Sequence, residues 1–194
     1  MPHYAKKTTD LHFQYHFGSG ELCSISDRGD YDLKNHSQQS GEKLKTEGIT
    51  PHIIEVSFGV ERLMLAILED AYQEETVENS KGKETKREVL KLHPLLAPYF
   101  VAVIPWKKPL REKAQQIYQK LLTEINFSVT YEETDRIGKS YHYQDAIGTY
   151  YCLTVDDQTL NDETITIRER DSKKQFRLSC QELSQFLNQK YQEY

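Results

Sequence analysis

Three side chains that lie close together in the sequence, Glu55, Ser57 and Arg62, could bind a small charged substrate. Side chains alternate along a strand, so Glu55 and Ser57 would point from the same strand face. Arg62 falls in the first turn of a predicted helix, where free backbone N–H groups and the helix dipole favour an anion. An arginine at such a position can hold a phosphate through two parallel hydrogen bonds. The spacing therefore predicts a site that combines a carboxylate, a hydroxyl and a phosphate-binding arginine.

A strand, a glycine and a helix must position these side chains. Residues 52–58 alternate polar and apolar types and are rich in β-branched and aromatic residues, which is typical of a strand. Gly59 supplies a turn. Apolar residues then recur every three or four positions, which predicts an amphipathic helix from Val60 to about Glu75. An ordinary buried strand and helix, with a solvated arginine and glutamate, is the alternative interpretation of this pattern.

Composition limits the class of protein. The 194 residues are 37% hydrophobic and 28% charged, which fits one large or two small globular domains. No apolar stretch is long enough to span a membrane, and the first residues lack the apolar core of a secretion signal. Three widely spaced cysteines predict reduced thiols in a cytoplasmic protein without a metal site of its own. The net charge of −5 argues against non-specific nucleic-acid binding but allows a local basic patch.

The first part of the chain predicts an antiparallel sheet. Residues 11–17 and 21–26 alternate as strands, and the glycine-rich link between them indicates a hairpin. Residues 37–50 are polar and predict a surface loop, whereas the charged residues 76–87 predict a flexible insertion. Two prolines then disfavour a continuing helix, so we expect a domain boundary between residues 93 and 99.

The second part, residues 99–194, predicts a separate α/β module. We expect strands at 99–106, 127–131, 149–155, 164–168 and 175–179, and helices at 110–125, 137–144 and 181–191. The opening strand–helix–strand order implies a parallel, right-handed crossover, and the last two strands read as a hairpin. The expected result is a mixed five-stranded sheet flanked by helices.

The stretch Glu55-Val-Ser-Phe-Gly-Val-Glu-Arg62 resembles motif 3 of class II aminoacyl-tRNA synthetases, in the form typical of the glycyl enzymes. A longer upstream series resembles the same family at His3, Tyr4, Ala5, Asp10, Glu21, Leu22, Ile25, Arg28, Asp30, Tyr31, Asp32, Leu33 and His36. Many spacings that agree in order are far more specific than one motif. Two residues depart from the pattern: Ser24 stands where the family usually has glycine, and Val56 where it has proline. A side chain at residue 24 could crowd the nucleotide site, and the loss of proline frees the backbone.

Residues 99–194 resemble the anticodon-binding domain of the same group. The matching elements are Leu96-Ala-Pro98, Val101–Pro105, Ile137–Tyr141, Asp145–Thr149, Val155-Asp156 and Thr166–Asp171. On the predicted hairpin, Arg168 and Arg170 are candidate tRNA contacts. A solvated hairpin face is the alternative interpretation of these two arginines.

The resemblance implies an α+β fold and a glycine–tRNA ligase. Residues 1–93 would be part of a class II antiparallel sheet with the motif 3 helix, and residues 99–194 the anticodon-binding domain. ATP would activate glycine as an adenylate for transfer to tRNA. The implied ATP-binding residues are Glu21, Leu22, Gly59, Val60, Glu61 and the catalytic Arg62, and the implied glycine-binding residues are Glu55, Val56, Ser57, Phe58 and Gly59. Mg²⁺ would accompany ATP, with Glu21 as a contributor.

The implied partners are glycine and tRNA-Gly, together with the rest of the enzyme. The resemblance covers only the C-terminal part of the family's protein, without motifs 1 and 2, and the family's complete enzyme is a homodimer. One arginine can anchor a phosphate tail, but attack at the α-phosphate needs positioned donors at that centre. We therefore expect activity to require a complementary N-terminal fragment. The alternatives are a non-catalytic tRNA-binding or regulatory protein and a truncated reading frame; the retained charged residues favour the enzyme.

Overall fold

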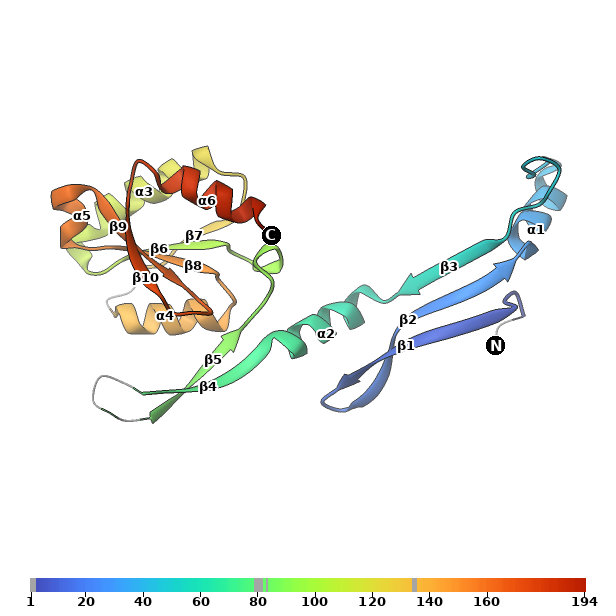
Figure 1. Ribbon diagram of the computed structural model, residues 1–194, viewed down its shortest axis with the longest axis horizontal. Helices are drawn as coiled ribbons and strands as arrows, with labels where there is room; N and C mark the ends of the chain where they lie inside the picture. The colour runs from blue at the N-terminus through green and yellow to red at the C-terminus, as the bar shows by residue number, and fades with distance from the viewer. Residues whose placement is uncertain (1–2, 79–81, 83, 134–135) are drawn as a thin grey trace. The chain divides into compact units, whose positions relative to one another are not determined.

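The computed structural model describes residues 3–78, 82, 84–133 and 136–194. The chain forms two compact units, residues 1–70 and residues 71–194 (Figure 1). The boundary expected between residues 93 and 99 thus lies inside the second unit. The physical reason is a set of buried ionic contacts, described below, that fastens residues 71–92 to the C-terminal module.

The first unit contains a three-stranded antiparallel sheet and two helices. Its elements are β1 (Lys7–Tyr15), β2 (Gly18–Gly29), α1 (Tyr31–Ser40), β3 (Ile53–Phe58) and α2 (Val60–Ala71), with strand order β1-β2-β3. The predicted first hairpin is confirmed, but it turns earlier than expected, because Tyr15 pairs with Gly18. The φ of Gly18 is +129°, a backbone conformation that favours glycine.

Helix α1 occupies part of the segment predicted as a loop at 37–50. It has no buried residues in the described unit, so its sequence carries no apolar stripe from which a helix could be predicted. Gly41 ends it in the left-handed conformation with φ of +78°, and the Gly41 N–H donates to the Ser37 carbonyl at 2.9 Å. This is the usual glycine cap of a helix.

The three strands give the sheet one polar and one apolar face. Directly opposed residues share a face, and the register places Ser24 beside both Asp10 and Ser57, and Ser26 beside Glu55. The apolar face carries Leu11, Ile25, Ile54, Val56 and Phe58, which are 37% to 61% exposed. Among the described residues of this unit, none covers that face well enough to bury it.

The second unit begins with a hairpin rather than with the continuing helix that we predicted. Helix α2 ends at Ala71, and β4 (Tyr72–Glu78) pairs antiparallel with β5 (Glu84–Leu90). The prediction of a flexible insertion at 76–87 is therefore wrong for its described residues; 79–81 and 83 lie outside them. An exposed cross-strand ion pair joins Glu74 and Lys86 at 2.9 Å.

A mixed five-stranded sheet forms the core of the second unit, as predicted. Its strands are β6 (Val101–Pro105), β7 (Val129–Tyr131), β8 (Tyr151–Val155), β9 (Thr164–Glu169) and β10 (Gln175–Ser179), in the order β10-β9-β8-β6-β7. β6 runs parallel to β7 and β8, whereas β8, β9 and β10 are antiparallel. Every residue of β6 and β8 is buried, because helices cover both faces of these strands.

The helices divide between the two faces of this sheet (Figure 1). α3 (Arg111–Glu124) and α6 (Leu183–Gln192) pack on the side of Val101, Val103 and Leu153. α4 (Ile137–Ala146) packs on the side of Ala102, Ile104 and Cys152. Short helical segments occupy η1 (Pro94–Leu96), η2 (Lys108–Leu110) and α5 (Asp157–Asp162). Among the described residues, no helix is long and apolar enough to cross a membrane.

Candidate functional site

The segments expected to contact ATP meet at Arg62. Its Nη1 donates a hydrogen bond to the main-chain carbonyl of Glu21 at 3.0 Å, and the Glu21 carboxylate lies 3.8 Å away. The Leu63 N–H donates to the Gly59 carbonyl at 3.0 Å, which starts the helix immediately before Arg62. The structure thus brings Glu21, Gly59 and Arg62 together. Val60 and Glu61 are exposed on the same helical turn, and Leu22 is half-buried on β2.

The turn between β1 and β2 holds helix α2 in place. The Tyr15 hydroxyl donates to the Arg62 carbonyl at 3.1 Å, and Tyr15 itself is buried. One turn from the helix end, Glu69 accepts the His16 N–H at 2.9 Å and lies 2.6 Å from the His16 ring Nδ1. The sequence gives no signal for these contacts, because the partners are separated by about fifty residues and neither Tyr15 nor His16 belongs to a recognisable motif.

Glu55 and Ser57 lie on one strand face, as their spacing predicts, and Arg28 holds Glu55. Arg28 donates from Nη1 to Glu55 at 2.6 Å and from Nε and Nη2 to Asp32, also at 2.6 Å. Its guanidinium lies 4.0 Å from the centre of the Tyr4 ring, a cation–π contact. The hydrogen bonds from Arg28 lower the pKa of Asp32, which keeps that carboxylate charged.

A cavity of about 460 Å³ lies beside this ion pair. It is lined by Arg28, Asp32, Leu33, His36, Ile53, Glu55 and Val56. β3 is an edge strand of the sheet, so residues from both of its faces border the cavity. Two of the five expected glycine-site residues, Glu55 and Val56, belong to this lining. Ser57 and Phe58 end the strand, and Gly59 follows it. The cavity offers the carboxylates of Asp32 and Glu55, which can bind an ammonium group.

Ser24, at the position where a glycine was expected, is directed at a neighbouring strand. Its hydroxyl donates to the Asp10 carboxylate at 2.7 Å, and its backbone is paired opposite Ser57. The extra side chain is therefore satisfied within the polar face of the sheet.

The structure corrects our interpretation of Arg168. Its guanidinium is buried, with the residue 7% exposed, and both Nη atoms donate to Asp145 at 2.9 and 3.0 Å. It also lies 4.8 Å from the centre of the Tyr141 ring. A buried arginine whose two Nη atoms are held by a buried carboxylate is not available to a phosphate.

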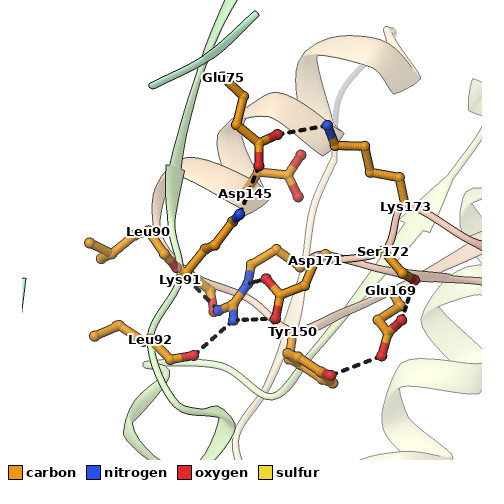
Figure 2. Close-up of polar contacts among 12 residues, drawn as sticks. Glu75, Leu90, Lys91, Leu92, Asp145, Tyr150, Glu169, Asp171, Ser172 and Lys173 are labelled. Atoms are coloured by element: carbon orange, nitrogen blue, oxygen red, sulfur yellow. Dashed lines mark hydrogen bonds and ion pairs between the residues drawn. The ribbon is translucent and has the colours of Figure 1, made fainter. Parts of the chain in front are cut away.

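Arg170 is buried still more completely and has a similar structural role. It is 2% exposed and donates to three main-chain carbonyls, those of Leu90, Leu92 and Gly148, at 3.1, 2.8 and 2.9 Å (Figure 2). It also pairs with the adjacent Asp171 carboxylate at 2.7 Å. Arg170 therefore fastens the chain segment that follows β5 to the five-stranded sheet.

Exposed basic and aromatic residues gather on helix α4 instead. Lys139, His142 and Tyr143 follow the i, i+3, i+4 spacing of one helix face, and Tyr143 is 55% exposed. Trp106, at the carboxyl end of β6, is 49% exposed and precedes Lys107. α4 follows β7, so its first turn lies at the same carboxyl edge of the parallel strands. Ligands of α/β sheets commonly bind at such an edge.

Among the described residues, no three His, Cys, Asp or Glu side chains are grouped so that they could hold a metal ion. Cys23, Cys152 and Cys180 are free thiols. Burial raises the pKa of Cys152 to about 12, which makes this thiol unreactive.

Comparison with known proteins identifies one matching domain family and several relatives of this chain. Residues 100–190 match the family model of the anticodon binding domain. The chain is similar to glycine–tRNA ligases over nearly its whole length. It is 48% identical to the ligase of Mycoplasmopsis synoviae and 45% identical to that of Clostridium acetobutylicum, over 96% of this chain in each case. The chain spans 42% and 40%, respectively, of the length of those curated relatives.

A solved structure supports the fold. The RNA binding domain of threonyl-tRNA synthetase from Cryptosporidium parvum superposes with a TM-score of 0.63, covering 93% of this chain and 42% of that one. Its sequence identity is 18%, so the likeness concerns the fold alone.

Proposed function

We propose that this chain provides one wall of the ATP and glycine sites, together with the tRNA-binding module, of a glycine–tRNA ligase. The observation that carries the proposal is the 42% to 48% identity to glycine–tRNA ligases over nearly the whole chain. The contact between Arg62 and Glu21 supports it, because both residues would bind ATP in such an enzyme and the contact brings them together.

Arg62 would hold the phosphate tail of ATP. It lies in the first turn of α2, where backbone N–H groups favour an anion, and its side chain is 60% exposed. Glu21 offers a half-exposed carboxylate beside it, which fits a Mg²⁺ ion that is bound mainly by phosphates and water. The ion would supply charge neutralisation on the phosphates. Leu22, Gly59, Val60 and Glu61 would complete this wall.

Glu55 would receive the ammonium group of glycine. Arg28 holds one carboxylate oxygen of Glu55, and Ser57 on the same face offers a hydroxyl. Val56, Phe58 and Gly59 would form the adjoining surface. Glycine has no side chain to bind, so its recognition must depend on charge and on a small enclosed space. The hollow beside Glu55 is open to solvent, so further walls would have to enclose it.

The exposed face of α4, with Trp106 and Lys107, would contact the anticodon loop of tRNA-Gly. Aromatic side chains stack on unpaired bases, and lysines neutralise phosphates. Affinity should therefore fall as salt rises, because phosphate contacts release counterions. Translation would place the protein in the cytoplasm.

The remaining length of the relatives would supply the groups that act at the α-phosphate, on the same polypeptide or on a separate one. The open apolar face of the first unit, with Val56 and Phe58 more than half exposed, is of the kind that another protein segment covers. The assembled enzyme would then be a homodimer.

A non-catalytic RNA-binding protein is the second candidate. The second unit has its own closed core around Phe100, Leu153 and Leu187, whereas the first unit leaves one sheet face open. A protein that used only the second unit would still bind tRNA.

Glycine-dependent ATP–pyrophosphate exchange distinguishes the two candidates. The full 194-residue chain is measured alone and with the N-terminal part of the Mycoplasmopsis synoviae relative supplied in trans. Exchange that appears only with the added part supports the ligase. Binding of tRNA-Gly without exchange, even with the added part present, would favour the second candidate.

A further inference from the structure

We infer that Arg87, on the hairpin that precedes the matched segment 100–190, is a positioning residue that fixes helix α4 through Asp145. For tRNA binding, the inference rests on the proposed role of the α4 face. The mechanical part, in which Arg87 acts on α4, stands on the geometry alone and can be tested without RNA.

Arg87 is one of the most buried charged side chains of the second unit. The side chain is 3% exposed and that of Asp145 is 1% exposed. Nε of Arg87 donates to Asp145 at 2.8 Å, and Nη2 lies 2.6 Å from the same carboxylate. Nη1 donates to Glu75 on the paired strand at 2.9 Å, and Nη2 also donates to the Arg170 carbonyl at 3.3 Å. The guanidinium therefore contacts the hairpin, α4 and the end of β9 at once.

Asp145 receives two arginines from two different elements. Arg168 approaches from β9 and Arg87 from β5, and both use charge-assisted hydrogen bonds. Because Asp145 lies in the last turn of α4, the positive charges are also on the favourable side of the helix dipole. Two rigid partners on one carboxylate fix both the position of α4 and its rotation about its axis.

The hairpin that carries Arg87 is itself fastened. Glu75 on β4 accepts Lys173 at 2.6 Å and Lys91 at 2.9 Å, so β4 is tied to the turn between β9 and β10 (Figure 2). The pair between Lys86 and Glu74, next to it along the hairpin, is exposed and does not reach α4. Glu75 therefore fixes the Arg87 guanidinium on the hairpin side, while the same guanidinium binds Asp145 on α4.

The rotation of α4 decides which side chains face solvent. Ser140, Gln144 and Asp145 are buried on one side, whereas Lys139, His142 and Tyr143 lie on the opposite side. A change in the Asp145 anchor would move the exposed face without removing any group from it. This couples a residue outside the matched domain to the proposed RNA contact.

The test compares Arg87→Met, Arg87→Lys and the matched control Lys86→Met in the full chain by amide hydrogen exchange. Arg87→Met removes the charge but leaves Asp145 paired with Arg168, so the chain should still fold. Protection of the amides at 141–147 should fall about tenfold, because a hydrogen bond to a charged group is lost, while α3 is unchanged. Arg87→Lys should restore part of the protection, and Lys86→Met should match the wild-type chain.

The second measurement is affinity for an isolated tRNA-Gly anticodon stem–loop, which should fall about tenfold in Arg87→Met and recover partly in Arg87→Lys. Unchanged α4 protection in Arg87→Met would overturn the inference, as would an equal loss across all elements. If Arg87→Met does not fold, Arg87→Lys decides in the same assay: a loss confined to α4 supports the inference, and wild-type protection overturns it. A wild-type chain that binds no stem–loop, with a loss confined to α4 in Arg87→Met, would reject the RNA role and keep the positioning role.

Discussion

Arg62 donates a hydrogen bond to the main-chain carbonyl of Glu21 at 3.0 Å, so its anchor is a backbone atom. Arg62→Ala should lower ATP–pyrophosphate exchange of the complemented enzyme by about 100- to 1000-fold, the usual cost of losing a preorganised donor. Arg62→Lys should recover only part of the rate, because a point charge cannot replace the planar fork. Lys34→Met, which removes an exposed lysine of α1, is the control. Equal rates for Arg62→Ala and the control would remove Arg62 from the proposed site.

Glu21→Gln removes the carboxylate of Glu21 but keeps its main-chain carbonyl, so it tests the carboxylate alone. Since the acceptor for Arg62 is the carbonyl, Arg62 should stay in place and the first unit should melt as in the wild-type chain. The loss of the carboxylate should raise the Mg²⁺ concentration needed for half-maximal exchange about tenfold, in line with the removal of a group near the ion. Titrating Mg²⁺ at fixed ATP checks this. An unchanged Mg²⁺ requirement would argue against a metal role for Glu21.

Arg28→Lys tests whether Arg28 orients Glu55 for glycine. The lysine keeps a positive charge but cannot bind Glu55 and Asp32 together through three nitrogens. A misplaced Glu55 should raise KM for glycine about ten- to a hundredfold, with a smaller change in kcat. KM for ATP should stay unchanged, and Lys34→Met again serves as the control. A parallel loss in both KM values would indicate a general structural role for Arg28.

Local patterns predicted most of the elements in the second unit. Strands β6 and β8 have continuous apolar runs, and helices α3 and α6 have 3.6-residue apolar stripes, because each buries a face in the core. Helix α4 buries Ser140, Gln144 and Asp145 instead, so its sequence shows no apolar stripe. Helix α1 has no buried residue, so it offers no such stripe. The β4–β5 hairpin was missed for a related reason: it is held by charge, and its sequence resembles that of a solvated loop.

The contacts within the sites could not be predicted from local sequence. Arg168 and Arg170 were assigned to RNA because a basic hairpin can be a phosphate-binding surface. Their acceptors decide otherwise: Asp145 lies 23 residues from Arg168, and the Leu90 carbonyl lies 80 residues from Arg170. The meeting of Glu21 and Arg62, 41 residues apart, likewise depends on tertiary structure. The family resemblance assigned both residues to ATP, whereas spacing alone says nothing of their contact.

The lowered pKa of Glu75 predicts that acid destabilises the second unit. Hydrogen bonds from Lys173 and Lys91 lower the pKa of Glu75 from 4.5 to about 2 in the folded chain. Because the folded pKa is the lower one, its stabilisation is fully present above about pH 4.5 and is lost as pH falls toward 2. Urea unfolding across this range should show the wild-type chain losing stability relative to Glu75→Gln. Glu74 is next to Glu75 but exposed, so Glu74→Gln should change the pH dependence of the unfolding free energy less. A constant difference between wild type and Glu75→Gln from pH 7 to pH 2 would contradict the assignment.

We expect the second folding unit to begin near residue 71. Residues 71–194 should unfold cooperatively, and residues 99–194 should be much less stable or unfolded. Removing 71–98 deletes Val89, which is fully buried, and the carbonyls of Leu90 and Leu92 that accept Arg170. Loss of the burial of the valine costs about 1.5–3 kcal/mol, and loss of each hydrogen bond from the charged Arg170 costs about 1.5–3 kcal/mol. Their sum approaches the whole stability of a small domain, about 5–15 kcal/mol. Circular dichroism melts of both fragments, with Lys86→Met in residues 71–194 as the surface control, measure the difference. Equal melting temperatures for the two fragments would place the boundary back near residue 99 and would show that the ionic contacts of the hairpin add nothing to stability.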